Sequence, residues 1–117
     1  MKYMLLNYVN EGGWGQVTPA EQEKWFGAYK SFIEAMASAG VLLGQGRLQP
    51  TSTATTVKVV DGNTQVLDGP YSDSKEQLGG YHMIEVADLD EAIAWAARCP
   101  TALHGTVEVR PLADMPE

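Results

Sequence analysis

The chain has 117 residues, 44% of them hydrophobic and 20% charged, which suits one globular domain. Eight Lys and Arg against fifteen Asp and Glu give a formal net charge of −7, which removes the attraction that drives binding to nucleic acid and anionic membranes. Cys99 is the single cysteine, so an intramolecular disulfide is excluded, and no apolar run suits a signal peptide or a membrane span. We therefore expect a single cytoplasmic domain over residues 1–117, with no nucleic-acid or membrane partner.

The chain begins with an apolar run. Residues 3–9 are rich in strand formers, which predicts a strand that is covered on both faces. Segment 10–16 contains three glycines and no periodicity, which predicts a mobile connection. Trp14 within it is either a lid over a site or a side chain folded over the edge of the core.

A capped helix follows this connection. Thr18 supplies an N-cap hydroxyl, Pro19 suits the first helical position and Glu21 completes a capping box. Aromatic and aliphatic residues then recur at three- and four-residue spacing until Gly40, which favours a left-handed helix stop. Residues 41–48 are predicted to return as a strand.

The second half repeats the pattern after a hairpin. Residues 53–60 and 64–67 alternate β-branched side chains around an Asp-Gly turn, which predicts a β-hairpin. A strand over 80–86, a helix capped by Asp88 and a last strand over 104–111 complete the chain. The order predicts an α+β domain of ferredoxin-like type, two βαβ halves with an inserted hairpin.

Alternation along the strands predicts two different sheet faces. One parity is expected to pack under the helices: Met4, Leu6, Ile84, Val86, Val107 and Val109. The opposite parity mixes polar and apolar residues: Tyr3, Leu5, Asn7, Tyr81, Met83, Glu85, His104, Glu108 and Arg110. Because such a face is too apolar for water and too polar for a dry core, we expect two copies to meet there as a homodimer around a partly polar cavity.

The loop after the hairpin is one candidate for ligand binding. Asp68, Lys75 and Glu76 could surround a small polar ligand, with Tyr71 as an aromatic wall. The structural alternative is equally simple, because Asp-Gly-Pro is turn chemistry in itself. Lys75 and Glu76 would then form a solvated pair worth at most about 1 kcal/mol.

The mixed sheet face is the second candidate. Tyr81, Glu85, Glu108 and Arg110 could line a cleft, in which His104 would exchange protons with either glutamate. Glu85 and Arg110 could equally form an ion pair that closes an interface. The structural alternative for His104 is a histidine that is satisfied by its own hydrogen bonds.

The sequence predicts neither a cofactor nor a metal. The lone Gly44-Gln45-Gly46 does not open a helix, and the early glycines lack the Lys-Ser/Thr of a phosphate loop. His82 is predicted to face away from His104, so the two would not share a metal ion.

The segment Asp68-Gly69-Pro70-Tyr71-Ser72-Asp73-Ser74-Lys75-Glu76, followed by Gly79-Gly80-Tyr81, resembles the signature of the DGPF subgroup of the YCII-related proteins. The likeness extends from the opening Met1-Lys2-Tyr3-Met4-Leu5-Leu6 to the closing Val107-Glu108-Val109-Arg110-Pro111. Tyr71 stands where that family usually has phenylalanine. The resemblance implies a dimeric α-β barrel.

The resemblance implies less about chemistry. Members of the wider YCII group carry a histidine and aspartate pair proposed as an acid-base dyad, with the histidine in the first helix, and some relatives are dehydrochlorinases. The predicted helix over 18–39 contains no histidine, so that dyad does not carry over. Genes for DGPF-type proteins often lie beside those for extracytoplasmic-function sigma factors. Two functions follow: binding of a small metabolite, with or without acid-base chemistry, and a non-catalytic accessory or sensor role in a regulatory or stress circuit.

Overall fold

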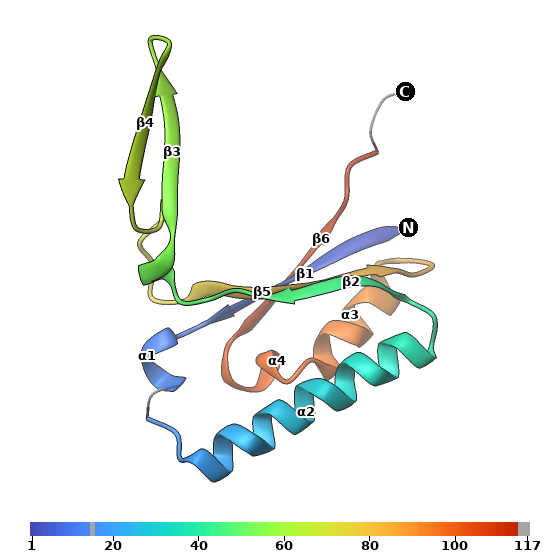
Figure 1. Cartoon of the computed structure of the whole chain (residues 1–117). Helices are drawn as coiled ribbons and strands as arrows, with labels where there is room; N and C mark the ends of the chain where they lie inside the picture. The colour runs from blue at the N-terminus through green and yellow to red at the C-terminus, as the bar shows by residue number, and fades with distance from the viewer. Residues whose placement is uncertain (15, 115–117) are drawn as a thin grey trace.

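A four-stranded antiparallel sheet forms the centre of the computed structural model, which describes residues 1–14 and 16–114. Its strands are β1 (Lys2–Val9), β2 (Leu42–Arg47), β5 (Gln77–Glu85) and β6 (Thr106–Pro111), in the order β2-β5-β1-β6. This arrangement confirms the ferredoxin-like α+β fold (Figure 1). The alternatives for the Trp14 side chain lie outside what the structure describes.

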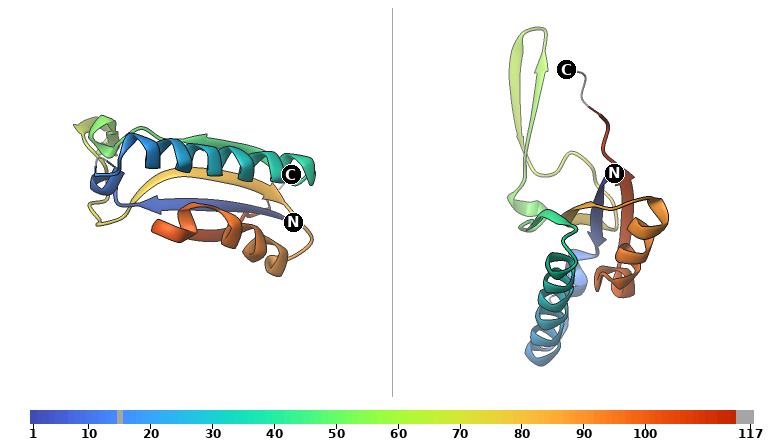
Figure 2. Two further views of the ribbon diagram at one scale, coloured as in Figure 1. Left: turned by 90° about the horizontal axis from the view of Figure 1, so that it is seen from below. Right: turned by 90° about the vertical axis from the view of Figure 1, so that its right-hand side faces the viewer.

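Two helices cover one face of this sheet, α2 (Pro19–Ser38) and α3 (Leu89–Arg98), as Figure 2 shows. Both begin at the predicted caps. Thr18 Oγ1 accepts a hydrogen bond from the Glu21 amide at 3.1 Å, and Asp88 Oδ1 accepts one from the Glu91 amide at 2.9 Å. Side-chain caps satisfy amides that would otherwise lack a partner at the first helical turn. None of the described helices is long and apolar enough to cross a membrane.

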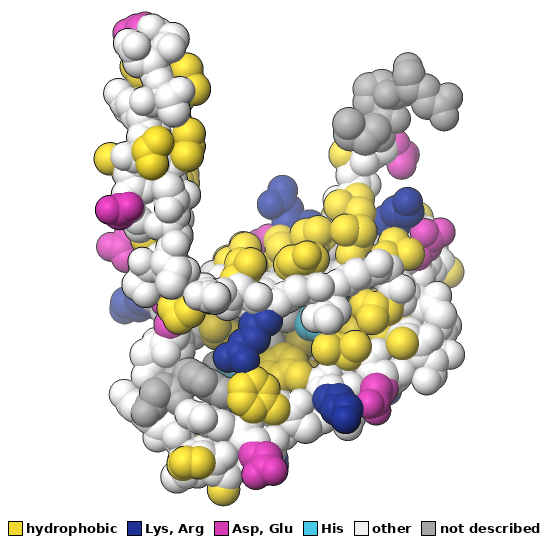
Figure 3. All heavy atoms as spheres, in the orientation of Figure 1, with side chains coloured by type: hydrophobic (Ala, Val, Ile, Leu, Met, Phe, Trp, Pro, Cys, Tyr) yellow, Lys and Arg dark blue, Asp and Glu magenta, His cyan; other side chains and the backbone are white. Residues whose placement is uncertain are grey.

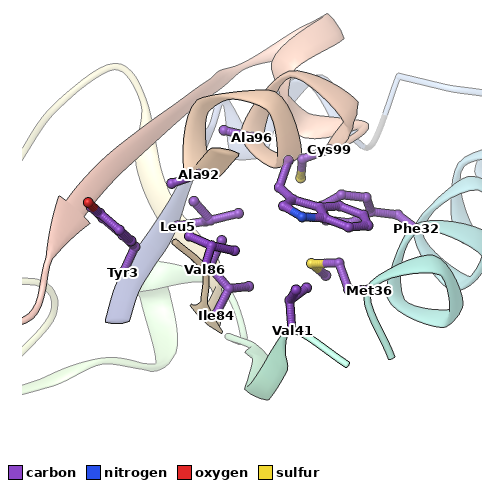
Figure 4. Close-up of a cluster of buried hydrophobic side chains, with 11 residues drawn as sticks. Tyr3, Leu5, Phe32, Met36, Val41, Ile84, Val86, Ala92, Ala96 and Cys99 are labelled. Carbon is purple, nitrogen blue, oxygen red and sulfur yellow. The ribbon is translucent and has the colours of Figure 1, made fainter. Parts of the chain in front are cut away.

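The core fills the space between the sheet and these helices (Figure 4). Its buried apolar side chains are Tyr3, Leu5, Phe32, Met36, Val41, Ile84, Val86, Ala92, Trp95, Ala96 and Cys99. Burying each large aliphatic or aromatic side chain contributes about 1.5–3 kcal/mol, so this layer supplies most of the stability of the chain.

The sides of β1 are the reverse of the prediction. Tyr3, Leu5 and Asn7 are buried beneath the helices, whereas Met4 and Leu6 are only half-buried on the other face. The prediction was correct for Ile84 in β5, for Val86 just after it, and for Val107 and Val109 in β6, all of which pack with the core. Every residue from Tyr3 to Leu6 is apolar, so parity in β1 gave no signal of its own.

We call the uncovered side of the sheet the open face. Its residues are Met4, Leu6, Tyr8, Tyr81, Met83, Glu85, Glu108 and Arg110. Figure 3 shows hydrophobic side chains gathered along this face. No element of the described chain packs over it, whereas the helices seal the opposite side.

The hairpin of β3 (Thr55–Val60) and β4 (Asn63–Asp68) forms a separate two-stranded sheet. It projects from the side of the sheet that the helices leave open (Figures 1 and 2). Its turn has the positive φ angles that the Asp-Gly pair predicts, 50° at Asp61 and 78° at Gly62. Five apolar side chains of the hairpin are exposed to solvent: Val57, Val59, Val60, Val66 and Leu67. Within residues 1–14 and 16–114 no other element covers these apolar side chains. An isolated two-stranded hairpin is at best marginally stable in water.

Short helical segments appear where the sequence predicted other structure. The connection expected to be mobile contains α1 (Glu11–Trp14), and a 3₁₀ turn, η1 (Thr51–Thr53), precedes the hairpin. Glu11 joins the two, since its carboxylate accepts hydrogen bonds from the Thr51 amide and hydroxyl, both at 2.8 Å. Residues 101–104 form α4 (Thr101–His104), so His104 is helical and not the first residue of the last strand.

Candidate functional site

Buried polar side chains form a row between the sheet and the helices. Asn7 Nδ2 donates to His82 Nδ1 at 3.3 Å, and the Cys99 thiol donates to Asn7 Oδ1 at 3.8 Å. The His82 ring also meets the edge of Phe32 at a centroid distance of 5.3 Å. Asn7 and His82 come from adjacent antiparallel strands, and Cys99 follows α3. Each buried polar group in this row therefore has a partner, as burial requires.

A second polar group lies beside this row and reaches solvent. The Tyr29 hydroxyl is 2.5 Å from Thr101 Oγ1 and 3.1 Å from His104 Nε2. The His104 ring also packs edge-on against Trp25, with ring centroids 4.7 Å apart. Tyr29 and Trp25 belong to α2, whereas the other two residues belong to α4. Tyr29, Thr101 and His104 thus form one hydrogen-bonded cluster, which we call the Tyr29 cluster.

Burial changes the acidity of these groups. Burial lowers the pKa of both His82 and His104 below the ordinary 6.5, so both imidazoles are neutral near pH 7. Burial also raises the pKa of Tyr29, partly offset by its bond to Thr101, so the phenol stays protonated. A neutral His104 accepts a proton and a neutral Tyr29 donates one. The Tyr29 cluster therefore contains both partners that proton exchange needs.

A pocket of about 370 Å³ opens next to the Tyr29 cluster. Its walls come from α2, from the end of α3 and from α4: Trp25, Ala28, Ser31, Phe32, Arg98, Pro100 and Leu103. We call it the helix-side pocket. Trp25 joins it to the Tyr29 cluster, because the same indole that lines the pocket contacts His104. Small-molecule sites in proteins have this character, apolar walls with a few polar groups.

A second hollow of about 410 Å³ lies on the outer side of α3. It is lined by Ile93, Ala96, Ala97, Ala102, Gly105, Thr106, Val107 and Val109. No charged or titratable side chain lines it, so it offers little to orient a polar ligand.

The cleft residues predicted from the sequence lie on two opposite sides of the sheet. Tyr81, Glu85, Glu108 and Arg110 all lie on the open face, and the Tyr81 ring lies over Gly46, where an added Cβ would approach it to 2.9 Å. His104 lies on the opposite side of the sheet, beside α2. The structure therefore does not bring His104 together with Glu85 or Glu108.

Glu85 and Arg110 are also not on neighbouring strands. β5 and β6 both pair with β1, which lies between them, and Glu85 stands opposite Lys2 while Arg110 stands opposite Met4. Their strands are therefore not neighbours within one chain, because parity assigns a face and says nothing about which strands are adjacent. An ion pair between Glu85 and Arg110 across a dimer interface stays a prediction.

The loop that carries the DGPF-like signature is open to solvent. Asp68, Lys75 and Glu76 are exposed, and Tyr71 is 89% exposed. Gly69 has a φ of 106°, its amide donates to Ala54 O at 2.7 Å, and its carbonyl accepts from Thr56 Oγ1 at 2.7 Å. The positive φ and these two hydrogen bonds explain why a glycine occupies position 69 of this turn. A ligand role for Asp68, Tyr71, Lys75 and Glu76 remains a prediction that these contacts do not address.

Sequence reasoning missed Tyr29 and Thr101. Tyr29 lies on the apolar stripe of α2 and was counted as core, and nothing in the sequence distinguishes Thr101 from an ordinary helix-cap residue. Tyr29 is 72 positions from Thr101 and 75 positions from His104 in the chain. Within the described residues, no group of three or more His, Cys, Asp and Glu side chains could hold a metal ion.

A solved structure with a similar fold is 5-chloro-2-hydroxyhydroquinone dehydrochlorinase (TftG) from Burkholderia phenoliruptrix AC1100, in complex with 2,5-dihydroxybenzoquinone. The match has a TM-score of 0.54 and covers 97% of this chain and 94% of that one, at 14% sequence identity. At this identity the likeness supports the α+β fold alone.

Two sequence comparisons identify the family. An uncharacterized protein of Rhizobium meliloti (strain 1021) is 36% identical over 115 residues, which cover 97% of this chain and 93% of that protein. The model of the YCII-related domain matches residues 1–116. On this evidence the chain belongs to the YCII-related family.

Proposed function

We propose that this protein binds a small molecule in the helix-side pocket and that the Tyr29 cluster exchanges a proton with it. The observation that carries the proposal is the position of His104, whose ring packs against the Trp25 wall of the pocket while its Nε2 lies 3.1 Å from the Tyr29 hydroxyl. A concave apolar site beside titratable groups with perturbed pKa is the usual character of a ligand site.

The hydrogen bonds of the cluster permit a defined proton arrangement. When His104 Nε2 carries its proton and donates to Tyr29, the phenol donates in turn to Thr101 Oγ1. The Nδ1 atom of His104 then has a lone pair that accepts a proton from a ligand. When that proton is taken up, Tyr29 and Thr101 continue to orient the ring. Thr101 and Tyr29 thus position His104, which is the group that exchanges the proton.

The similar structure supports the class of ligand. It is a dehydrochlorinase in complex with 2,5-dihydroxybenzoquinone, so one protein of this fold holds a small ring compound. The two chains are 14% identical, and the chemistry proposed for this protein therefore depends on its own Tyr29 cluster.

Thermal shift against a metabolite panel tests the proposal. A ligand at 100 times its Kd should add about 2.7 kcal/mol of stability to the wild-type protein. The shift should disappear in Trp25→Ala and persist in Ile93→Ala, the matched control that lines the other hollow. If no compound shifts the wild type, or if hits ignore Trp25→Ala, the helix-side pocket is not the site.

Calorimetry tests the role of His104 separately. For a ligand that loses a proton on binding, wild-type protein should take that proton up, so the heat should depend little on the ionisation enthalpy of the buffer. His104→Gln should bind the same ligand with a buffer-dependent heat, because the proton is then released to solution. Equal buffer dependence in both proteins would contradict proton exchange by His104.

The open face supports a homodimer as the second part of the proposal. Met4, Leu6 and Met83 are half-buried there with none of the described elements above them, and the hairpin presents further exposed valines on the same side. A second copy would cover both surfaces across a two-fold axis. A light-scattering mass of one chain at micromolar concentration would contradict it. Met83→Asp should weaken association while the circular dichroism stays unchanged.

The accessory role makes the opposite prediction for ligands. The exposed hairpin favours it, because an apolar arm of this kind can bind another protein. An accessory protein without a ligand should show no metabolite shift, whether or not Trp25 is present. Any hit that depends on Trp25 therefore decides against this alternative.

A further inference from the structure

The helix-side pocket contains one charged side chain, Arg98, at the end of α3. Its guanidinium carbon lies 4.4 Å from the centroid of the Trp95 ring, on which it is stacked. This contact holds the cation in place and leaves its in-plane N–H groups available. In residues 1–14 and 16–114, no carboxylate lies within ion-pair distance of Arg98.

Arg98 is one of eight basic residues in a chain with fifteen acidic ones and a net charge of −7. The other groups that line the pocket are apolar except for Ser31, so none of them neutralises the guanidinium. Apolar walls beside a fixed cation strengthen its attraction to an anion, although Arg98 itself is exposed to solvent. The pocket therefore favours a ligand with one acidic group at the Arg98 end.

The remaining walls determine the shape of the ligand. Trp25 and Phe32 present aromatic rings to the pocket, and Leu103 and Pro100 add flat or compact apolar surface. Aromatic walls pack well against a planar ring. The volume of about 370 Å³ lies near the lower end of the range for ligand pockets, which suits one substituted ring and is small for a nucleotide cofactor.

From these observations we infer that the ligand of the helix-side pocket is a single-ring aromatic anion, a carboxylate or phenolate. Arg98 binds the acidic group of this ligand, and Trp25 and Phe32 enclose the ring of the ligand. This inference rests on the proposed function, since it names the ligand class of the same pocket. It places the acidic group at Arg98 and the ring beside the Trp25 wall, and the same indole contacts the His104 ring.

Benzoate and benzamide are suitable probes, because they differ in charge and hardly in shape. The wild-type protein should bind benzoate more tightly than benzamide in calorimetric or NMR titrations. Arg98→Gln should weaken benzoate about tenfold, which corresponds to one lost charge-assisted hydrogen bond, and change benzamide by less than about twofold. Arg98→Lys should recover part of the loss. Because Arg98 is exposed, each variant should keep the wild-type circular dichroism.

Two further variants identify which cation acts. Lys30→Gln removes one exposed positive charge from α2 without touching the pocket and should leave both affinities unchanged. Arg110→Gln removes the arginine of the open face, the cation predicted from sequence. If Arg110→Gln weakens benzoate selectively while Arg98→Gln does not, the anion binds at the open face and the inference is wrong.

The outcomes separate the inference from the proposed function. Equal affinity of the wild type for benzoate and benzamide, with both lost in Trp25→Ala, would overturn the anion preference and leave the pocket as a ligand site. Binding of neither probe, with no other hit from the metabolite panel, would overturn both. A selective tenfold loss of benzoate in Arg98→Gln, with benzamide retained, establishes the inference.

Discussion

The two faces of the central sheet use the same strands for different purposes. On the helix-covered face Leu5 and Ile84 are fully buried, and polar groups such as Asn7 are each hydrogen-bonded. On the open face the adjacent Leu6 and Met83 remain half-buried, beside exposed Glu108. One face is therefore completed within the chain, whereas no element of residues 1–14 and 16–114 covers the other.

The pair of leucines in β1 gives the largest expected difference between the faces. Leu5→Ala removes a fully buried side chain from the core and should lower the free energy of unfolding by about 2–5 kcal/mol at any protein concentration. Leu6→Ala acts on the open face and should cost much less in the isolated chain. In a dimer its effect should depend on protein concentration. Urea unfolding at two protein concentrations measures the cost of each substitution. If Leu6→Ala cost as much as Leu5→Ala at both protein concentrations, the distinction between the two faces would be wrong.

Glycine substitutions sharpen the comparison through steric tolerance. A Cβ at Gly105 would lie 2.2 Å from the Tyr8 carbonyl oxygen, so Gly105→Ala forces backbone apart and should cost about 1–3 kcal/mol or more. A Cβ at Gly46 would meet the Tyr81 ring at 2.9 Å, and that side chain can rotate away over the open face. Gly46→Ala should therefore cost little. Thermal unfolding of both variants provides the measurement. A larger loss of stability in Gly46→Ala than in Gly105→Ala would contradict the expectation that a side chain yields more easily than the backbone.

The pH dependence of stability should come from the helix-covered face. Burial lowers the pKa of His82 below 6.5, so the unfolded chain binds a proton more readily than the folded chain. Stability should be complete above about pH 6.5 and fall as the pH drops below it, by at most about 1.4 kcal/mol per pH unit from this group. Urea unfolding measured from roughly pH 7.5 to roughly pH 5 should show this loss of stability in the wild type. The dependence of stability on pH should be shallower in His82→Gln.

His104→Gln provides the matched comparison for that slope. In the wild type the His104 imidazole also has a lowered pKa, but His104 is exposed to solvent whereas His82 is buried. The slope should therefore change less in His104→Gln than in His82→Gln. The reverse order would mean that the buried His82 does not control the acid sensitivity of the fold.

The smallest expected effect concerns metal removal. The described residues contain no group of three or more His, Cys, Asp and Glu side chains that could hold a metal ion, so a chelator should leave the Tm unchanged. Elemental analysis should find far less than one transition metal per chain. Stoichiometric zinc or copper would require a site that involves a second copy, most simply across the open face.

Local chemistry in the sequence determined the elements of this fold. The caps at Thr18 and Asp88 start the two long helices, and the Asp61-Gly62 pair makes the hairpin turn, each through bonds within a few residues. The alternation in β5 and β6 also assigned their faces correctly, because polar and apolar residues differ there. The order of these elements was enough to predict the ferredoxin-like arrangement, and the charge balance set the expected class of partners.

Tertiary structure decided the site. In β1 both parities are apolar from Tyr3 to Leu6, so only the packing of Leu5 against the helices chose the buried side. His104 was assigned to a strand by its neighbours, yet one helical turn places it beside Tyr29, which is 75 residues earlier in the chain. Contacts at that separation depend on how whole elements pack, and no local pattern encodes them. The elements therefore follow from the sequence alone, while the association of Tyr29, Thr101 and His104 beside the helix-side pocket exists only because α2 and α4 cover the same face.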